Sequence, residues 1–254
     1  MPPGSPPDPR RRRALEALLV DLGPQLCRGP SSSPEPVDRS RIPSGYAEVD
    51  ALVGGGFPKD RLSEISGPIS SGRTSLALAL LATITGSGQL AAVVDAADAF
   101  DPLSAESAGV DLDRVLWARA PGWREALRCC ERLLETEGIP LLLLDLASDL
   151  GSQTANASRP SKPRERNANT RAPEVAWLRL ARQVQNSGTL LVVLSTQRLT
   201  GSHAEIALEM QSANACFRGS PALLEELEIR AVLARHRALP IDRTVSVRLG
   251  TRAA

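Results

Sequence analysis

Apolar residues along the chain fall into short runs separated by polar turns, and the period of each run indicates an element. Strands are predicted at residues 61–65, 90–94, 113–118, 141–145 and 189–194. Helices are predicted at residues 76–82, 123–136 and 175–184, with a short helix before Gly54–Gly56. Two alternating runs, 227–236 and 244–249, predict a closing hairpin. Because strands and helices alternate from Leu62 to Leu194, we expect an α/β fold with a mostly parallel central sheet flanked by helices.

The first part of the chain has a different composition. Residues 1–9 hold five prolines and are predicted to be disordered. Residues 10–26 predict an amphipathic N-terminal helix whose leucines fall on one side, and 29–39 is a Pro/Ser-rich linker. We therefore divide the chain into residues 1–41 and a core over 42–254. The helix either folds back on that core or docks on another protein, and its Arg10–Arg13 run is either a solvated end or a contact for phosphate or an acidic partner.

The segment between the first core strand and its helix has the pattern of a phosphate-binding loop. It consists of Gly67, Pro68, Ile69, Ser70, Ser71, Gly72, Arg73, Thr74 and Ser75. In such a loop, backbone N–H groups and a helix N-terminus hold the phosphates, a lysine reaches the terminal phosphates, and a Ser or Thr hydroxyl binds Mg²⁺. Here Thr74 is present, but the basic residue is Arg73, which is bulkier and planar. We therefore expect this segment to bind a nucleotide, while hydrolysis is in question. The alternative to a phosphate-binding loop is a Gly/Ser-rich turn before an ordinary helix.

A second candidate for metal binding closes the strand at 141–145. Asp145 follows four leucines. An Asp at the end of a strand downstream of a phosphate loop commonly orients Mg²⁺ through water, so Thr74 and Asp145 are the predicted metal ligands. The alternative is a turn Asp that closes a core strand.

Composition narrows the functional classes. The chain has 254 residues with a formal net charge of +1, which argues against a uniformly basic DNA-coating protein. Aromatic residues make up 3%, too few for a base-stacking platform. The four cysteines form no C-x-x-C pair, so neither a zinc site nor a disulfide framework is indicated. Without a membrane-length apolar run, we expect a cytoplasmic protein with no membrane contact.

Local basic charge is concentrated in a long polar segment, residues 151–173. Its basic residues are Arg159, Lys162, Arg164, Arg166 and Arg171, against the single acid Glu165 between them. Such a long loop in a compact domain is either functional or disordered. The choice is between a DNA contact and a solvated insert.

Taken together, residues 42–249 resemble the RecA-like recombinase superfamily. The resemblance is carried by 56–68, which leads into the phosphate loop, by Val94-Asp95-Ala96-Ala97 and the following Asp101-Pro102, and by the strand ending at Asp145. It implies a RecA-like P-loop NTPase core that binds ATP and Mg²⁺. It also implies that Asp101 bonds the adenine, that the 151–173 loop contacts single-stranded DNA, and that Arg235 and Arg237 act across an interface between subunits.

Departures from the family pattern fall on the catalytic positions. The family's water-activating Glu is Ala97 here, the phosphate-loop Lys is Arg73, and the adenine-stacking Tyr is Ser104. The family's Asn-Gln pair falls near Ser195-Thr196, although Gln197 serves if the register shifts by one. At most a weak ATPase is expected, because alanine offers no general base.

This degraded catalytic set is similar to that of the ImuA family, RecA-like accessory proteins of a damage-inducible mutagenesis cassette. That resemblance implies an accessory role in DNA repair, SOS mutagenesis and translesion synthesis, with a DNA polymerase-type or RecA-family partner and a possible homo-oligomer. Two alternatives to this accessory role stay open. One is an active DNA-dependent ATPase that mediates strand exchange, and the other is a non-catalytic scaffold in cell division or signalling.

Overall fold

A computed structural model describes residues 41–146, 172–185, 187–218 and 223–250. All of them belong to one compact unit, Ser40–Ala254, and the description below concerns that unit alone. The predicted N-terminal helix at 10–26 and the basic residues Arg159, Lys162, Arg164, Arg166 and Arg171 lie outside the described residues. No helix in the described ranges is long and apolar enough to cross a membrane.

Eight strands of the described chain form the central sheet, in the order β10-β9-β8-β3-β7-β6-β4-β5. Their bounds are β3 (Leu62–Ser66), β4 (Ala91–Asp95), β5 (Val115–Arg119), β6 (Leu141–Asp145), β7 (Leu190–Ser195), β8 (Ile206–Arg218), β9 (Leu223–His236) and β10 (Thr244–Gly250). Neighbours from β8 to β5 are parallel, and β9 and β10 add an antiparallel edge. The expected α/β fold with a mostly parallel sheet is confirmed.

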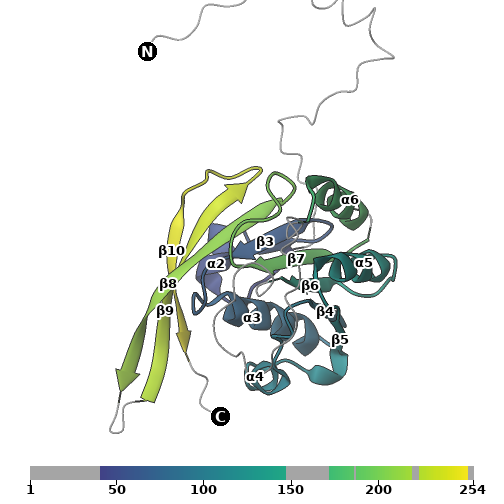
Figure 1. Ribbon diagram of the computed structural model, residues 1–254. Helices are drawn as coiled ribbons and strands as arrows, with labels where there is room; N and C mark the ends of the chain where they lie inside the picture. The colour runs from purple at the N-terminus through teal and green to yellow at the C-terminus, as the bar shows by residue number, and fades with distance from the viewer. Residues whose placement is uncertain (1–40, 147–171, 186, 219–222, 251–254) are drawn as a thin grey trace, which may run out of the picture. The chain divides into compact units, whose positions relative to one another are not determined.

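Helices cover both faces of this sheet. They are α2 (Ala47–Leu52), α3 (Arg73–Gly86), α4 (Pro102–Ser107), α5 (Trp123–Leu134) and α6 (Glu174–Val184). A short 3₁₀ helix, η1 (Leu112–Arg114), precedes β5, and β1 (Arg41–Ile42) pairs with β2 (Phe57–Pro58) beside the main sheet. Figure 1 shows α5 and α6 side by side on one face, while α2 and α3 share a core with the other.

The apolar strands are buried because both faces are covered. Leu141 and Leu143 of β6 pack into the core that contains α2 and α3, whereas Leu142 and Leu144 pack into the core with α5 and α6. All four are at most 2% exposed. A strand buried on both sides is a continuous apolar run, as the sequence shows here.

The edge of the sheet holds the largest difference from the expected elements. The hairpin is confirmed, since β10 pairs antiparallel with β9. However, β8 was not predicted at all. It pairs with β3 only from Ile206 to Glu209 and continues along β9, so β8, β9 and β10 form a long ribbon beside the core (Figure 1). The strand predicted at 113–118 begins instead at Val115, because η1 occupies the residues before it.

Candidate nucleotide-binding site

The phosphate loop lies where the sequence places it, between β3 and α3 at the carboxyl edge of the sheet. Its first residue, Gly67, lies against β8: a Cβ there would stand 2.3 Å from the Met210 carbonyl oxygen and 2.8 Å from Ser71 Oγ. Gly72 is the N-cap of α3 with φ of 86°, a left-handed conformation that glycine adopts without strain. The two glycines therefore fix the path of the loop for steric reasons.

Two hydrogen-bond donors in this loop have no partner within the described residues. They are the hydroxyl Oγ of Ser71 and Nη1 of Arg73, and both atoms are buried. The side chain of Arg73 is only 9% exposed. Buried polar groups in folded proteins are nearly always hydrogen-bonded, so unsatisfied donors at the N-terminus of a helix suit an anion. The loop thus fits the phosphate of a nucleotide.

Arg73 and Asp145 act on each other electrostatically. Burial lowers the pKa of the Arg73 guanidinium, and the nearby carboxylate of Asp145 raises it. Arginine stays protonated in proteins, so the loop carries a buried positive charge on which the charge of Asp145 acts. Asp145 is the last residue of β6, as the sequence predicts. It lies in register with Asp95, the last residue of the neighbouring strand β4.

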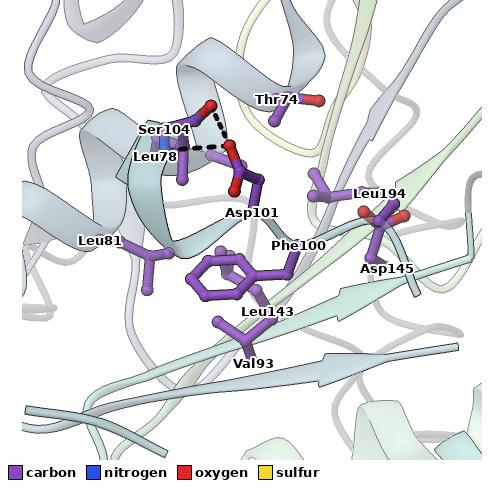
Figure 2. Close-up of a pocket in the computed structure, with 12 residues that line it drawn as sticks. Thr74, Leu78, Leu81, Val93, Phe100, Asp101, Ser104, Leu143, Asp145 and Leu194 are labelled. Atoms are coloured by element: carbon purple, nitrogen blue, oxygen red, sulfur yellow. Dashed lines mark hydrogen bonds between the residues drawn. The ribbon is translucent and has the colours of Figure 1, made fainter. Parts of the chain in front are cut away.

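A pocket of about 180 Å³ opens beside the loop, between α3, α4 and the strands β4, β6 and β7. It brings together three of the predicted site residues: Thr74, Asp101 and Asp145. The other lining residues are Ala77, Leu78, Leu81, Val93, Ala99, Phe100, Ser104, Leu143 and Leu194. Figure 2 shows the Phe100 ring next to Leu143 and Val93, with Asp101 and Ser104 at the other end. The pocket is therefore mainly apolar with a few polar groups.

Asp101 has a structural role that the sequence analysis did not assign. It is the N-cap of α4: its carboxylate accepts hydrogen bonds from the backbone N–H of Leu103 at 3.3 Å and of Ser104 at 3.1 Å, and from the Ser104 hydroxyl. These bonds from Ser104 lower the pKa of the carboxyl. A contact with adenine would have to share oxygens already used in the cap, so that role stays a prediction.

The loop that carries Ala97 is held by a buried aspartate. Asp95, at the end of β4, accepts hydrogen bonds from the backbone N–H groups of Ala97, Ala99 and Phe100 and from the indole N–H of Trp117. These hydrogen bonds hold the backbone of the loop in place. The side chain at position 97 is only a methyl group. The carboxylates among the pocket-lining residues are Asp101 and Asp145, and that of Asp101 already accepts the hydrogen bonds of the α4 cap.

Glu64 is a further functional candidate that the sequence analysis missed. It is fully buried in β3, three residues before Gly67. Its carboxylate accepts hydrogen bonds from the backbone N–H of Leu199 at 2.5 Å and from the N–H and hydroxyl of Thr200. It therefore ties the connection between β7 and β8 to the strand that leads into the phosphate loop. A charged residue inside an apolar strand was the available signal, since such a group needs buried partners.

The two arginines predicted to act in trans are not among the residues that line the pocket. Arg235 Nε donates a hydrogen bond to the carbonyl oxygen of Ala204 at 2.7 Å, and Arg237 Nε lies 3.6 Å from a carboxylate oxygen of Glu205. Both arginines thus contact the segment just before β8 within their own chain. Their role across an interface stays a prediction.

The predicted metal ligands, Thr74 and Asp145, offer a hydroxyl and a carboxylate, which are oxygen donors of the kind that Mg²⁺ uses together with water and substrate phosphates. Within the described ranges, no three His, Cys, Asp or Glu side chains gather as a metal cluster. The predicted ligands Thr74 and Asp145 line one pocket, and their role as metal ligands stays a prediction.

A strand, a loop with the phosphate-binding pattern, a helix and a carboxylate at the end of β6, two strands away from β3, are the arrangement of a P-loop α/β fold. A family model, the RecA N-terminal domain, matches residues 31–211. The chain therefore belongs to the RecA N-terminal domain family. Among solved structures it is similar to the RadB recombinase, with 20% sequence identity and a TM-score of 0.61 over 83% of this chain and 97% of that chain. This likeness shows a shared fold.

Proposed function

We propose that the chain is a RecA-like protein of DNA repair or recombination that binds a nucleotide and hydrolyses it slowly or not at all. The observation that carries this proposal is the phosphate loop, which keeps buried hydrogen-bond donors for an anion. The family resemblance adds that Ala97 stands where relatives have a water-activating Glu. The chain thus keeps the groups that bind a phosphate and lacks the side chain that activates water.

Slow hydrolysis follows from the lack of a suitable base. A general base works best when its pKa lies near the working pH. Asp101 is a poor candidate because its hydrogen bonds with Ser104 hold the pKa of its carboxyl low. Losing a general base costs about 10²–10⁴-fold in rate.

The finer role that we propose is that of an accessory protein in SOS mutagenesis and translesion synthesis, close to the ImuA family. The departures from the family pattern at Ala97, Arg73 and Ser104 support it, because they change catalytic and adenine-stacking positions and leave the fold whole. Single-stranded DNA would be bound through the basic segment at 159–171, which carries five basic residues and Glu165. Such contacts are to phosphates and carry no sequence preference.

For protein partners, we propose that the amphipathic segment at 10–26 docks on a polymerase-type protein, a RecA-family protein or a second copy of the chain. Arg235 and Arg237 would then approach the neighbour's nucleotide. Deleting residues 1–28 and measuring mass in solution and partner capture tests this. Unchanged assembly and capture by a soluble deletion would count against docking, and aggregation would assign the helix to the core.

The test of the main proposal measures nucleotide binding and phosphate release with and without single-stranded DNA. We expect ATP and ADP to bind and little phosphate to be released. Robust DNA-stimulated release would instead favour the active recombinase. The absence of any binding at millimolar nucleotide would leave the regulatory scaffold as the better account.

A further inference from the structure

The pocket beside the phosphate loop has room for the planar ring of a base. Its volume of about 180 Å³ exceeds the roughly 150 Å³ of an apolar cavity that holds benzene in another protein. Thr74, in the first turn of α3, lines this pocket and also belongs to the phosphate loop. A nucleotide whose phosphates lie at the loop can therefore place its base in the pocket.

The polar side chains at one end of the pocket, Asp101 and Ser104, offer acceptors to such a base (Figure 2). The hydrogen of the Ser104 hydroxyl is donated to a carboxylate oxygen of Asp101, so the hydroxyl oxygen is left as an acceptor. A carboxylate has about four acceptor positions, and the bonds from Leu103 and Ser104 occupy three of those on Asp101. Both side chains thus keep free lone pairs and lack a free hydrogen.

The backbone N–H groups around this end are already used as well. Those of Ala99 and Phe100, two residues that line the pocket, donate to the carboxylate of Asp95. That of Ser104 donates to the carboxylate of Asp101. A base that enters here therefore meets acceptors rather than donors among these groups.

The two purines differ in what they present to a set of acceptors. Guanine carries two adjacent donors on one edge, N1–H and the N2 amino group. Adenine carries the N6 amino group beside N1, whose lone pair would face the carboxylate or the hydroxyl oxygen. A polar atom left without a partner on binding costs affinity, so acceptors in a row favour guanine.

We propose that this site prefers guanine nucleotides to adenine nucleotides, with Asp101 and Ser104 accepting hydrogen bonds from N1 and N2 of the base. This inference rests on the proposed nucleotide binding and adds which base is preferred. Adenine nucleotides still bind through their phosphates, but more weakly. Asp101 is exposed, and water weakens the discrimination, so we expect about tenfold rather than the 10⁴-fold of an enclosed polar site.

The test is calorimetric titration of the full chain with GDP and with ADP in the same Mg²⁺ buffer. The diphosphates are used because hydrolysis of the terminal phosphate then does not disturb the comparison. We expect a dissociation constant for GDP that is about tenfold or more below that for ADP. Equal affinities, or tighter binding of ADP, overturn the inference and leave the proposed function standing. No binding of either nucleotide at millimolar concentration overturns the proposed function itself.

Asp101→Asn separates the base contact from the helix cap. Asparagine caps a helix about as well as aspartate does, but its amide places N–H donors where the carboxylate has an acceptor. The variant should lose about tenfold or more in affinity for GDP and change by less than about threefold for ADP. Asp111→Asn, the same exchange at the N-cap of η1 and outside the pocket lining, is the control and should leave both affinities unchanged. Unchanged GDP affinity in Asp101→Asn, or an equal loss for both nucleotides, would overturn the inference.

Discussion

Replacing Gly67 by alanine tests the geometry of the phosphate loop directly. The added Cβ would lie 2.3 Å from the Met210 carbonyl oxygen and 2.8 Å from Ser71 Oγ. A carbon and a carbonyl oxygen approach to about 3.3 Å even in weak C–H···O contacts, so the loop or β8 must move by about 1 Å. The carbonyl belongs to the backbone of β8, which pairs with both β3 and β9 and cannot yield cheaply.

We therefore expect Gly67→Ala to lower the free energy of unfolding by about 2–3 kcal/mol, the upper part of the range for overpacking. Gly86→Ala is the matched control at the end of α3: its Cβ would meet nothing within 4 Å. It should raise the free energy of unfolding by about 0.5 kcal/mol, since alanine favours the helix. Urea unfolding followed by circular dichroism measures both. A Gly67→Ala protein as stable as the wild type would refute the close contact between the loop and β8.

Three further predictions concern stability, catalysis and DNA. Glu64→Ala removes the acceptor of the buried N–H and hydroxyl of Thr200 and of the partly buried N–H of Leu199, and it should lower the free energy of unfolding by about 2–5 kcal/mol. The exposed control Glu106→Ala should stay within about 0.5 kcal/mol in the same urea unfolding experiment. Similar values for both variants would contradict the role of Glu64. Ala97→Glu combined with Arg73→Lys should raise phosphate release by about 10²-fold or more, and an unchanged rate would show that the loop geometry has also been lost. If single-stranded DNA binds, the slope of log K against log salt should be about −0.7 per phosphate contact. Replacing the three arginines at 164–171 by alanine should flatten that slope, and an unchanged slope would reassign the segment.

The core of the fold was predictable because burial leaves a strong pattern. Strands β4, β6 and β7 are buried on both faces, so each is a continuous apolar run with polar residues at its end. The phosphate loop was predictable because steric needs at Gly67 and Gly72 restrict those positions to glycine. In both cases a local pattern reflects a local physical requirement.

What could not be predicted depends on neighbours that are distant in the chain. In β8, Ile206, Ala207 and Leu208 are all buried between β3 and β9, and only then do exposed Glu209 and buried Met210 begin to alternate. This change of period within one strand hides it from a search for either pattern. The cap at Asp101 could have been predicted from the sequence, because an Asp before a proline is a common helix start. The family resemblance implied only a contact between Asp101 and adenine.

The central claim is that the loop binds a nucleotide and does not turn it over efficiently. A single experiment decides it: radiolabelled ATP is mixed with an excess of the full-length protein and single-stranded DNA, and bound nucleotide and released phosphate are followed in the same sample. Our account predicts that the bound label stays ATP over many minutes. Rapid conversion of the bound label to ADP and phosphate, or no bound label at all, would contradict it.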